Sequence, residues 1–224
     1  MKLSLVIPTI NRLDLLVNAS HILASQAGSF YKLVIIDNGR QPGFLEHVAS
    51  LGCPNILPVV NPRNAGVGPS WNQGIDLVPD TDWYLILNDD IEVGADQIRL
   101  IREYLEEPAS PALDKYLVWN VGFCLFCISR LAIDDLKSRD GFVFDPQFYP
   151  AYFEDNDIVR RVMLLGKELR TGAECFIPSL FRNSQTLAKN PSLNQNFGSN
   201  QQKYIAKWGG LPAHERFTRP YNKP

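Results

Sequence analysis

The sequence predicts an α/β protein with a doubly wound, mostly parallel central sheet flanked by helices, and a smaller mixed or antiparallel portion. Short apolar runs alternate with segments of helical periodicity through the first half, which is typical of a parallel sheet. The spacing becomes irregular in the second half, which favours the smaller portion. Because no repeat or linker is visible, 1–224 is predicted to be one domain, with halves at about 1–115 and 116–210 and a tail at 211–224.

The first half supplies the parallel part of the sheet. Apolar runs bounded by turn residues predict strands at 3–8, 32–37, 56–60 and 83–87. Helical spacing predicts helices at 13–23, 44–51, 70–77 and 95–105. Asn11 is expected to cap the first helix, with Asp14 in its first turn.

The second half mixes strands and helices less regularly. Residues 117–129 predict one long strand or two short ones, and Ser129 is expected to cap a helix at 130–136. A helix from 154 to 165 should end at Gly166. Strands at 169–171 and 175–181, a polar, turn-rich segment at 186–198 and a helix at 200–208 complete the prediction.

Composition excludes some classes of function. The formal net charge is −2, from 22 basic and 24 acidic residues, so no global basic field favours nucleic acid. Apolar residues make up 45% of the chain, yet no apolar run approaches the roughly 18 residues of a membrane span. We therefore expect a cytoplasmic protein without a transmembrane segment, and peripheral membrane contact stays open.

The cysteines indicate buried thiols more than a metal or redox site. Cys124 and Cys127 have the CxxC spacing of a redox motif or half a zinc site. They lie within a strongly apolar stretch, however, while Cys53 and Cys175 are isolated. We interpret all four as reduced thiols, a common state of cysteine in a reducing compartment.

The run Asn88-Asp89-Asp90 is the strongest functional signal. It ends the apolar run at 83–87, so a buried strand delivers adjacent carboxylates to the edge of the sheet. Two neighbouring carboxylates repel each other unless a cation lies beside them, and their oxygens suit Mg²⁺ or Mn²⁺. A metal-assisted site for a negatively charged ligand is the favoured interpretation, and a helix cap is the alternative.

Polar clusters follow the other three predicted parallel strands as well. They are Pro8-Thr9, Asp37-Asn38 and the segment 61–68, so all should meet at one sheet edge. The segment 61–74 leads into a helix N-terminus, a natural place for phosphate or a nucleobase, or it is an ordinary turn. Asp37 could accept hydrogen bonds from a ribose or base, or form an Asx turn.

A second acidic cluster, Glu154-Asp155-Asn156-Asp157, follows a run rich in aromatic residues. Acids belong in the first turn of a helix, and Asp157 with Arg161 forms an i,i+4 pair. Three acids in four residues nevertheless exceed what a helix start requires. Carboxylates beside aromatic surface have raised pKa values and can act as bases, so a catalytic role is the other interpretation.

Together these motifs resemble the family 2 glycosyltransferases, which have the GT-A fold. The resemblance covers roughly 3–210, and a rhamnosyltransferase-like branch is the most similar, because of the Asn-Asp-Asp and Glu-Asp-Asn-Asp runs. The motifs that carry it are Ser4-Leu5-Val6-Ile7-Pro8-Thr9, Val34-Ile35-Ile36-Asp37-Asn38-Gly39, 61–66, Asn72-Gln73-Gly74, Leu87-Asn88-Asp89-Asp90 and Phe153-Glu154-Asp155-Asn156-Asp157.

The resemblance implies an inverting hexosyltransferase that moves a sugar from a UDP- or dTDP-sugar to a hydroxyl of a polysaccharide, a lipid-linked sugar or a protein glycan. The first half would bind the nucleotide sugar, and the second half the acceptor. Asp155 would be the general base, and Asp90 with Asp89 would hold Mn²⁺ or Mg²⁺ at the place of the family's DXD motif. The residues implied to bind substrate are Pro8, Thr9, Asp37, Arg63, Asn64, Gly66, Asn88, Asp89, Glu154 and Asp157.

The chain departs from the family pattern in two places. Asn88 stands where the DXD motif has its first aspartate, and no histidine follows Phe181 at the position where many relatives have a metal ligand. Arg182 could compensate phosphate charge there, and His214 could replace the histidine, although a lone histidine there is more often a surface residue. A nucleotidyltransferase-like enzyme and a noncatalytic nucleotide-sugar-binding module are the alternative functions.

Overall fold

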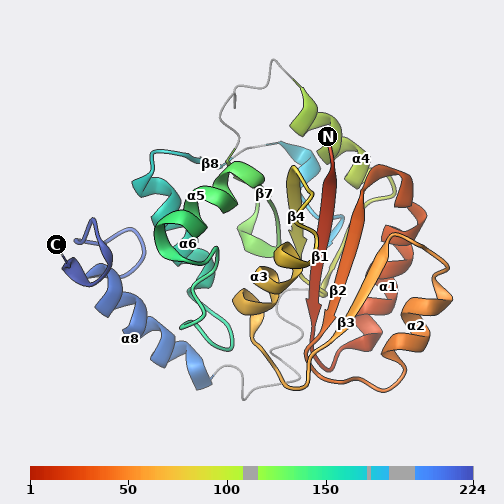
Figure 1. Ribbon diagram of the computed structural model, residues 1–224, viewed down its shortest axis with the longest axis horizontal. Coiled ribbons are helices and arrows are strands. Elements are labelled where there is room, and N and C mark those ends of the chain that lie inside the picture. The colour runs from red at the N-terminus through yellow and green to blue at the C-terminus, as the bar shows by residue number, and fades with distance from the viewer. Residues whose placement is uncertain (108–115, 171–172, 182–194, 224) are drawn as a thin grey trace.

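The computed structural model describes residues 1–107, 116–170, 173–181 and 195–223. A seven-stranded sheet with the order β3-β2-β1-β4-β7-β6-β8 runs through the centre of the molecule (Figure 1). Its strands are β1 (Leu3–Thr9), β2 (Lys32–Asp37), β3 (Ile56–Val60), β4 (Trp83–Leu87), β6 (Leu117–Trp119), β7 (Leu125–Ser129) and β8 (Glu168–Arg170).

Most of the sheet is parallel, as the sequence predicts. The strands β1 to β4 all run in the same direction, whereas β7 is antiparallel to both β4 and β6. The α/β fold class is therefore confirmed. Residues 117–129 form two strands, because the chain turns between them through a 3-10 helix (Gly122–Cys124) that begins with a left-handed Gly122 at φ 57°.

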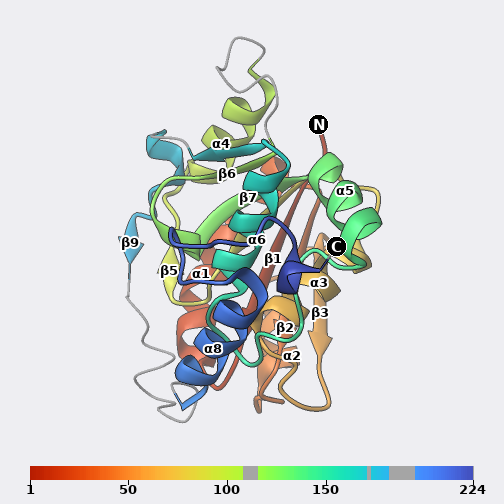
Figure 2. The same cartoon turned by 90° about the vertical axis from the view of Figure 1, so that its left-hand side faces the viewer.

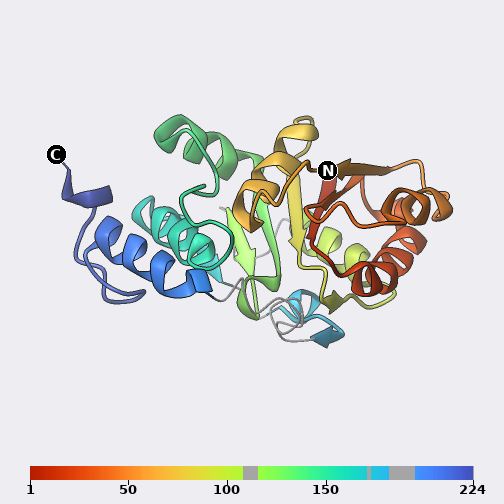
Figure 3. The same cartoon turned by 90° about the horizontal axis from the view of Figure 1, so that it is seen from below.

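Helices cover both faces of the sheet (Figure 3). One face packs against α1 (Leu13–Ser25), α2 (Phe44–Ser50) and α4 (Gln97–Glu106), and the other against α3 (Val67–Leu77), α5 (Arg130–Asp140) and α6 (Glu154–Leu164). The sheet is thus buried on both sides, which explains why its strands are continuous apolar runs instead of alternating ones.

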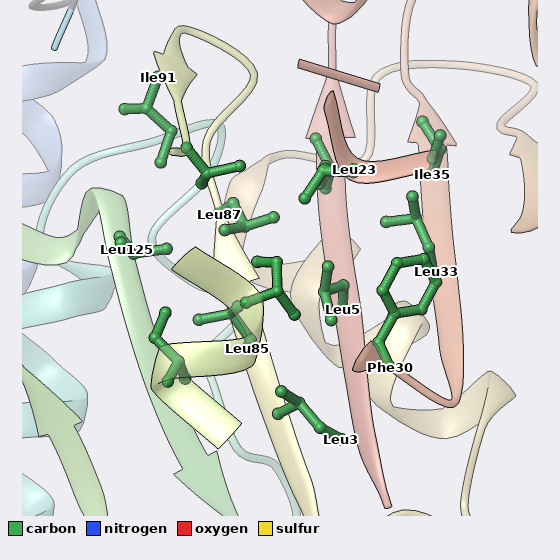
Figure 4. Close-up of a cluster of buried hydrophobic side chains, with 14 of the residues drawn as sticks. Leu3, Leu5, Leu23, Phe30, Leu33, Ile35, Leu85, Leu87, Ile91 and Leu125 are labelled. Atoms are coloured by element: carbon green, nitrogen blue, oxygen red, sulfur yellow. The ribbon is translucent and has the colours of Figure 1, made fainter. Parts of the chain in front are cut away.

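Side-chain alternation along each strand divides the core around the sheet into two clusters, one on each face. In β1, Leu5 and Ile7 belong to the cluster under α1, whereas Val6 belongs to the cluster under α3. Figure 4 shows the first cluster, in which leucines of neighbouring strands meet Leu23 of α1. Burial of these side chains at about 25 cal/mol per Å² is the main force that holds the strands together, and so fixes where they end.

Some local predictions are confirmed and others are wrong. Ser129 caps α5 by accepting a hydrogen bond from the Ala132 amide at 3.1 Å. Asn11 is not a cap, because it has a left-handed φ of 55° and Arg12 occupies the N-cap position without a side-chain cap bond. Within 175–181 only β9 (Leu180–Phe181) is a strand, and it pairs with the unpredicted β5 (Ile91–Glu92).

The helix α8 (Phe197–Trp208) lies beside α6 and is held there by buried charges (Figure 2). Asp157 of α6 pairs with Arg161 at 2.8 Å and with Lys207 of α8 at 2.6 Å, and it accepts a hydrogen bond from the Trp208 indole at 2.9 Å. Lys207 also pairs with Asp145 at 2.6 Å. This network joins α8 to α6 and to Asp145.

The segment predicted as a tail returns against α8. The amides of Arg216 and Phe217 donate to the Trp208 carbonyl at 3.0 and 2.9 Å. Arg160 of α6 donates to the Phe217 carbonyl at 2.9 Å. The chain reverses at Gly209, whose φ of 77° favours glycine.

The remaining predictions from composition concern the state of the cysteines and the absence of a membrane-spanning segment. Cys124 and Cys127 are buried, and all four cysteines are free thiols. In the described part of the chain, no helix is long and apolar enough to cross a membrane. Arg182 and most of the predicted polar segment 186–198 lie outside the described residues.

Candidate active site

A cavity of about 350 Å³ lies where the carboxyl ends of β1 and β4 meet the start of α6. It brings together polar residues from four strand ends and from the second acidic cluster, although these are far apart in the sequence. The predicted site residues that line it are Pro8, Thr9, Asn64, Asn88, Asp89, Asp90, Glu154 and Asp155. The predicted convergence of these strand ends at one sheet edge is therefore confirmed.

A buried arginine lies near the acidic pair that follows β4. Asp89 is 7% exposed, and the Arg12 side chain is 2% exposed. Arg12 donates to Asp14 at 2.9 and 3.0 Å. This hydrogen bond, followed by the charges of Asp14, Asp89 and Asp90, raises the pKa of Arg12. Arg12 thus interacts with both carboxylates while it is paired with Asp14, and nothing in the motif spacing identified it.

The second acidic pair begins α6 and faces the same cavity. Glu154 is 7% exposed, and its Oε2 has no hydrogen-bond partner among the residues that the structure describes. Burial, and then the charge of Asp155, raise the pKa of Glu154 well above its usual range. Burial also raises the pKa of Asp155, against the effect of a 2.8 Å hydrogen bond from the Asn156 amide. Glu154 thus tends to hold a proton, and Asp155 is a stronger base than an exposed aspartate.

The backbone is strained immediately before this acidic pair. Tyr152 and Phe153 have φ values of 77° and 72°, which bulky L-residues rarely adopt. The carbonyl of Phe153 nevertheless accepts the Asp157 amide at 2.9 Å and so starts α6. Such strain is maintained only where the surrounding packing determines it, and it is found mostly at functional sites.

Side-chain amides organise the loop after β2. The Asn38 side chain donates to the Ser70 hydroxyl at 2.8 Å and accepts from Asn61 at 2.8 Å. Asn61 also exchanges hydrogen bonds with Gln73 at 3.0 Å. Asn38, which we did not predict as a site residue, lines the cavity as a result.

Four of the predicted substrate-binding residues do not line this cavity. Asp37 is fully buried and accepts from the Gly39 and Gln41 amides at 2.7 and 2.6 Å, as expected for the Asx-turn alternative. Arg63 borders a neighbouring hollow beside Asn64. The other two, Gly66 and Asp157, make internal contacts.

Gly66 and Asp157 hold the walls of the cavity in place. Gly66 has a φ of 89°, and a Cβ there would lie 3.0 Å from the Pro150 carbonyl oxygen. Glycine therefore permits the loop before Tyr152 to approach α3 closely. Asp157 is fully buried in the network with Arg161 and Lys207 that holds α8.

The cavity also has an aromatic wall that the motifs did not indicate. Trp71 of α3 packs against Phe126 and Phe144 with ring centroids 5.4 and 4.8 Å apart, and it lines the cavity together with Phe123 and Tyr152. In the sequence, Trp71 is an apolar residue within a predicted helix, but a tryptophan that only fills the core has the same pattern. Only packing reveals that this one borders a cavity.

The donor atoms suit a divalent cation that is shared with a ligand. Asp89 and Asp90 bring carboxylate oxygens to the cavity, and such oxygens are the ligands of Mg²⁺ and Mn²⁺. Across the described ranges, no group of three or more histidine, cysteine, aspartate or glutamate side chains could hold a metal ion by itself. A cation here would take its remaining ligands from water or from the oxygens of a bound substrate.

Comparison with known proteins identifies the family. The model for "Glycosyl transferase family 2" matches residues 4–122, just over half of the chain. This match includes the parallel strands β1 to β4, except for the first residue of β1, and the acidic run after β4. No curated protein sequence matches the chain.

Solved structures show the same fold at low sequence identity. S. aureus TarS 1–349 is 16% identical, with a TM-score of 0.58 over 73% of this chain and 56% of that one. The mannosyltransferase PcManGT from Pyrobaculum calidifontis, in complex with GDP-Man and Mn²⁺, is 14% identical, with a TM-score of 0.60 over 95% and 66% of the two chains.

A third neighbour is glucosyl-3-phosphoglycerate synthase from Mycobacterium tuberculosis, in complex with Mn²⁺, UDP-glucose and phosphoglyceric acid. It is 12% identical, with a TM-score of 0.61 over 89% of this chain and 78% of that one. These likenesses establish the fold. This chain spans just over half the length of TarS 1–349.

Proposed function

Because the chain belongs to glycosyl transferase family 2, we propose that it transfers a sugar from a UDP- or dTDP-sugar to an acceptor hydroxyl, with inversion at the anomeric carbon. One observation carries this proposal. The acidic run after β4 and the pair Glu154-Asp155 are about sixty residues apart, yet they line one cavity. A donor held by the first group would thus present its sugar to the second.

The donor would lie along the strand ends. Pro8, Thr9 and Asn64 line the cavity next to Asn38, and we assign the nucleoside to this part. Asp37 would act indirectly, because its carboxylate holds the loop that presents Asn38. Arg63 borders the adjacent hollow, where it could reach a base or phosphate.

The other end of the cavity would take the diphosphate and the donor sugar. Asn88 and Asp89 would contact ribose or sugar, and Asp90 with Asp89 would hold Mn²⁺ or Mg²⁺. When bound, the cation supplies positive charge that stabilises the leaving diphosphate. Arg12 interacts electrostatically with the same carboxylates, although its hydrogen-bonded partner is Asp14.

Asp155 is the proposed base. The acceptor hydroxyl gives its proton to Asp155, and the hydroxyl oxygen bonds to the anomeric carbon as the bond to the diphosphate oxygen breaks. A single displacement inverts the anomeric centre without a covalent enzyme intermediate. The raised pKa of Asp155 favours this proton transfer, since a stronger base removes a proton more readily. Glu154, which tends to stay protonated, would hydrogen-bond a sugar hydroxyl.

Calorimetric titration of the full chain with UDP, dTDP, GDP and CDP, each with and without Mn²⁺, tests the donor site. Binding of one diphosphate that strengthens with Mn²⁺ would support the proposal and name the nucleotide. If none of the four binds under either condition, the donor site is not functional and the proposal fails.

Replacing Asp90 by alanine should remove the dependence on metal and lower transfer about 100-fold, because charge on the leaving diphosphate would be left uncompensated. Transfer to acceptor is measured across a range of Mn²⁺ concentrations. Asp96→Ala is the matched control, since this carboxylate is 70% exposed and does not line the cavity. Full wild-type activity in the presence of a chelator would contradict the role of the metal.

A further inference from the structure

A second cavity, of about 550 Å³, lies on the other side of the Glu154-Asp155 pair. It is bounded by the start of α6, by Phe197 and Gln201 of α8, and by 211–214 after that helix. Its volume is within the roughly 300–1,000 Å³ of small-molecule sites. Glu154, Asp155 and Tyr152 line both cavities, so a ligand in the second could reach the proposed base.

The walls of this second cavity expose large apolar side chains, which an ordinary solvated surface would not be expected to gather in one place. Phe197 is 45% exposed and Leu211 is 42% exposed. The Phe197 ring lies 5.1 Å from the Tyr152 ring and 5.3 Å from the Phe153 ring, measured between centroids. The ring is therefore supported from behind in a cluster of aromatics while part of it stays open. An exposed aromatic cluster in a hollow is typical of a ligand-binding surface.

The described lining of the second cavity contains no lysine or arginine. Its ionisable groups are the carboxyls of Glu154 and Asp155, the phenol of Tyr152 and the imidazole of His214. Arg160 and Arg216 lie on the neighbouring elements, where they donate to the main-chain carbonyls of Phe217 and Gly209 at 2.9 Å, and neither lines the cavity. A phosphate in this cavity would therefore face the Asp155 carboxylate without a lysine or arginine among the described lining residues.

Glu154 adds a hydrogen-bonding group. It is buried and lines the cavity, and its Oε2 atom lacks a hydrogen-bond partner in the described part of the chain. A buried oxygen without a partner costs free energy, about 1–3 kcal/mol, that a ligand hydroxyl could recover. An uncharged sugar offers both kinds of matching group. Its hydroxyl groups can hydrogen-bond to the carboxyls, and its C–H faces can pack against the aromatic rings.

We infer that the acceptor is an uncharged saccharide end that binds in this second cavity against Phe197, and that phosphorylated acceptors are excluded. The inference rests on the proposed glycosyl transfer and deepens it by naming the class of acceptor. His214 would contact this saccharide and not a metal, since it lines the second cavity and not the one that holds Asp90.

Saturation-transfer NMR on the full chain tests the inference directly. The probes are the methyl glycosides of glucose, galactose, mannose and N-acetylglucosamine, and the 6-phosphate of each. At least one neutral glycoside should bind, and its 6-phosphate should bind at least about tenfold more weakly. The inference is overturned if no neutral glycoside binds, or if the phosphates bind equally well or better.

Two variants locate the binding site. Phe197→Ala should weaken the neutral glycoside about tenfold, because the open aromatic face is lost. Tyr221→Ala is the matched control: this tyrosine is also 45% exposed but lies outside the cavity, and its removal should leave binding unchanged. Gln201→Lys should increase binding of the 6-phosphate. Unchanged binding in Phe197→Ala would place the saccharide elsewhere.

The outcomes separate this inference from the proposed function. Nucleoside diphosphate binding is measured on the same variants and should not change, since neither Phe197 nor Gln201 lines the first cavity. Diphosphate binding without any neutral glycoside binding would sink the inference and leave glycosyl transfer standing. Glycoside binding at Phe197 without any diphosphate binding would instead remove the proposed function.

Discussion

Replacing Asp155 by asparagine is expected to lower glycosyl transfer about 10³-fold while nucleoside diphosphate binding stays unchanged. Asparagine keeps the shape of the side chain, and its amide oxygen can still accept the 2.8 Å hydrogen bond from the Asn156 amide. What it loses is the ability to take a proton from the acceptor hydroxyl. The effect should therefore appear in the rate of transfer and not in donor affinity.

The measurement is the initial rate of transfer across pH, together with calorimetry of the diphosphate. In the wild type, activity should fall with decreasing pH through a pKa above the usual aspartate range, since burial raises the pKa of Asp155. This acid limb should be absent from the residual activity of Asp155→Asn. Asp134→Asn, which changes a carboxylate that is 62% exposed, is the control. Wild-type turnover in Asp155→Asn would exclude Asp155 as the base.

Replacing Asp157 by alanine is expected to reduce the free energy of unfolding by about 3–5 kcal/mol. Asp157 is fully buried, and the Arg161 and Lys207 side chains that pair with it are 1% and 3% exposed. Its removal would leave both cations less compensated in the interior and the Trp208 indole without its 2.9 Å acceptor. The desolvation cost of these charges would then count against the folded state.

Urea denaturation followed by circular dichroism measures this change. Asp134→Ala on α5 is the control, because its contact with Arg130 is 3.6 Å long and exposed, and surface pairs contribute at most about 1 kcal/mol. A loss of under about 1 kcal/mol for Asp157→Ala would mean that the buried network contributes little. At denaturant concentrations where the variant is folded, diphosphate affinity should remain as in the wild type.

The contrast between Asp155 and Asp157 shows where prediction from sequence stops. The run Glu154-Asp155-Asn156-Asp157 predicts an acidic start to a helix, and this is confirmed. Side chains two positions apart on an α-helix are separated by a rotation of roughly 200° about the helix axis. Asp155 and Asp157 therefore lie on nearly opposite sides of α6 and cannot face one cavity. Which of them faces it depends on what packs against α6, and α8 covers the Asp157 side.

The sequence by itself determined the strands and the polar residues at their ends. The apolar runs at β1, β2, β3 and β4 are local signals, and parallel strands must end at the same edge. The meeting of Thr9, Asn38 and Asp90 followed from that rule. Five of the six motifs that carry the family resemblance lie within 4–122, where the family model matches, and the motif at 153–157 lies outside it.

Only the tertiary structure decided which side chains face the cavities and which hold the fold. Arg12 lies near the acidic pair because α1 packs against β5, which directly follows that pair in the chain. Phe197 and Glu154 border one hollow because buried charges join α8 to α6. These contacts are long-range and depend on packing, so no local pattern of residues encodes them.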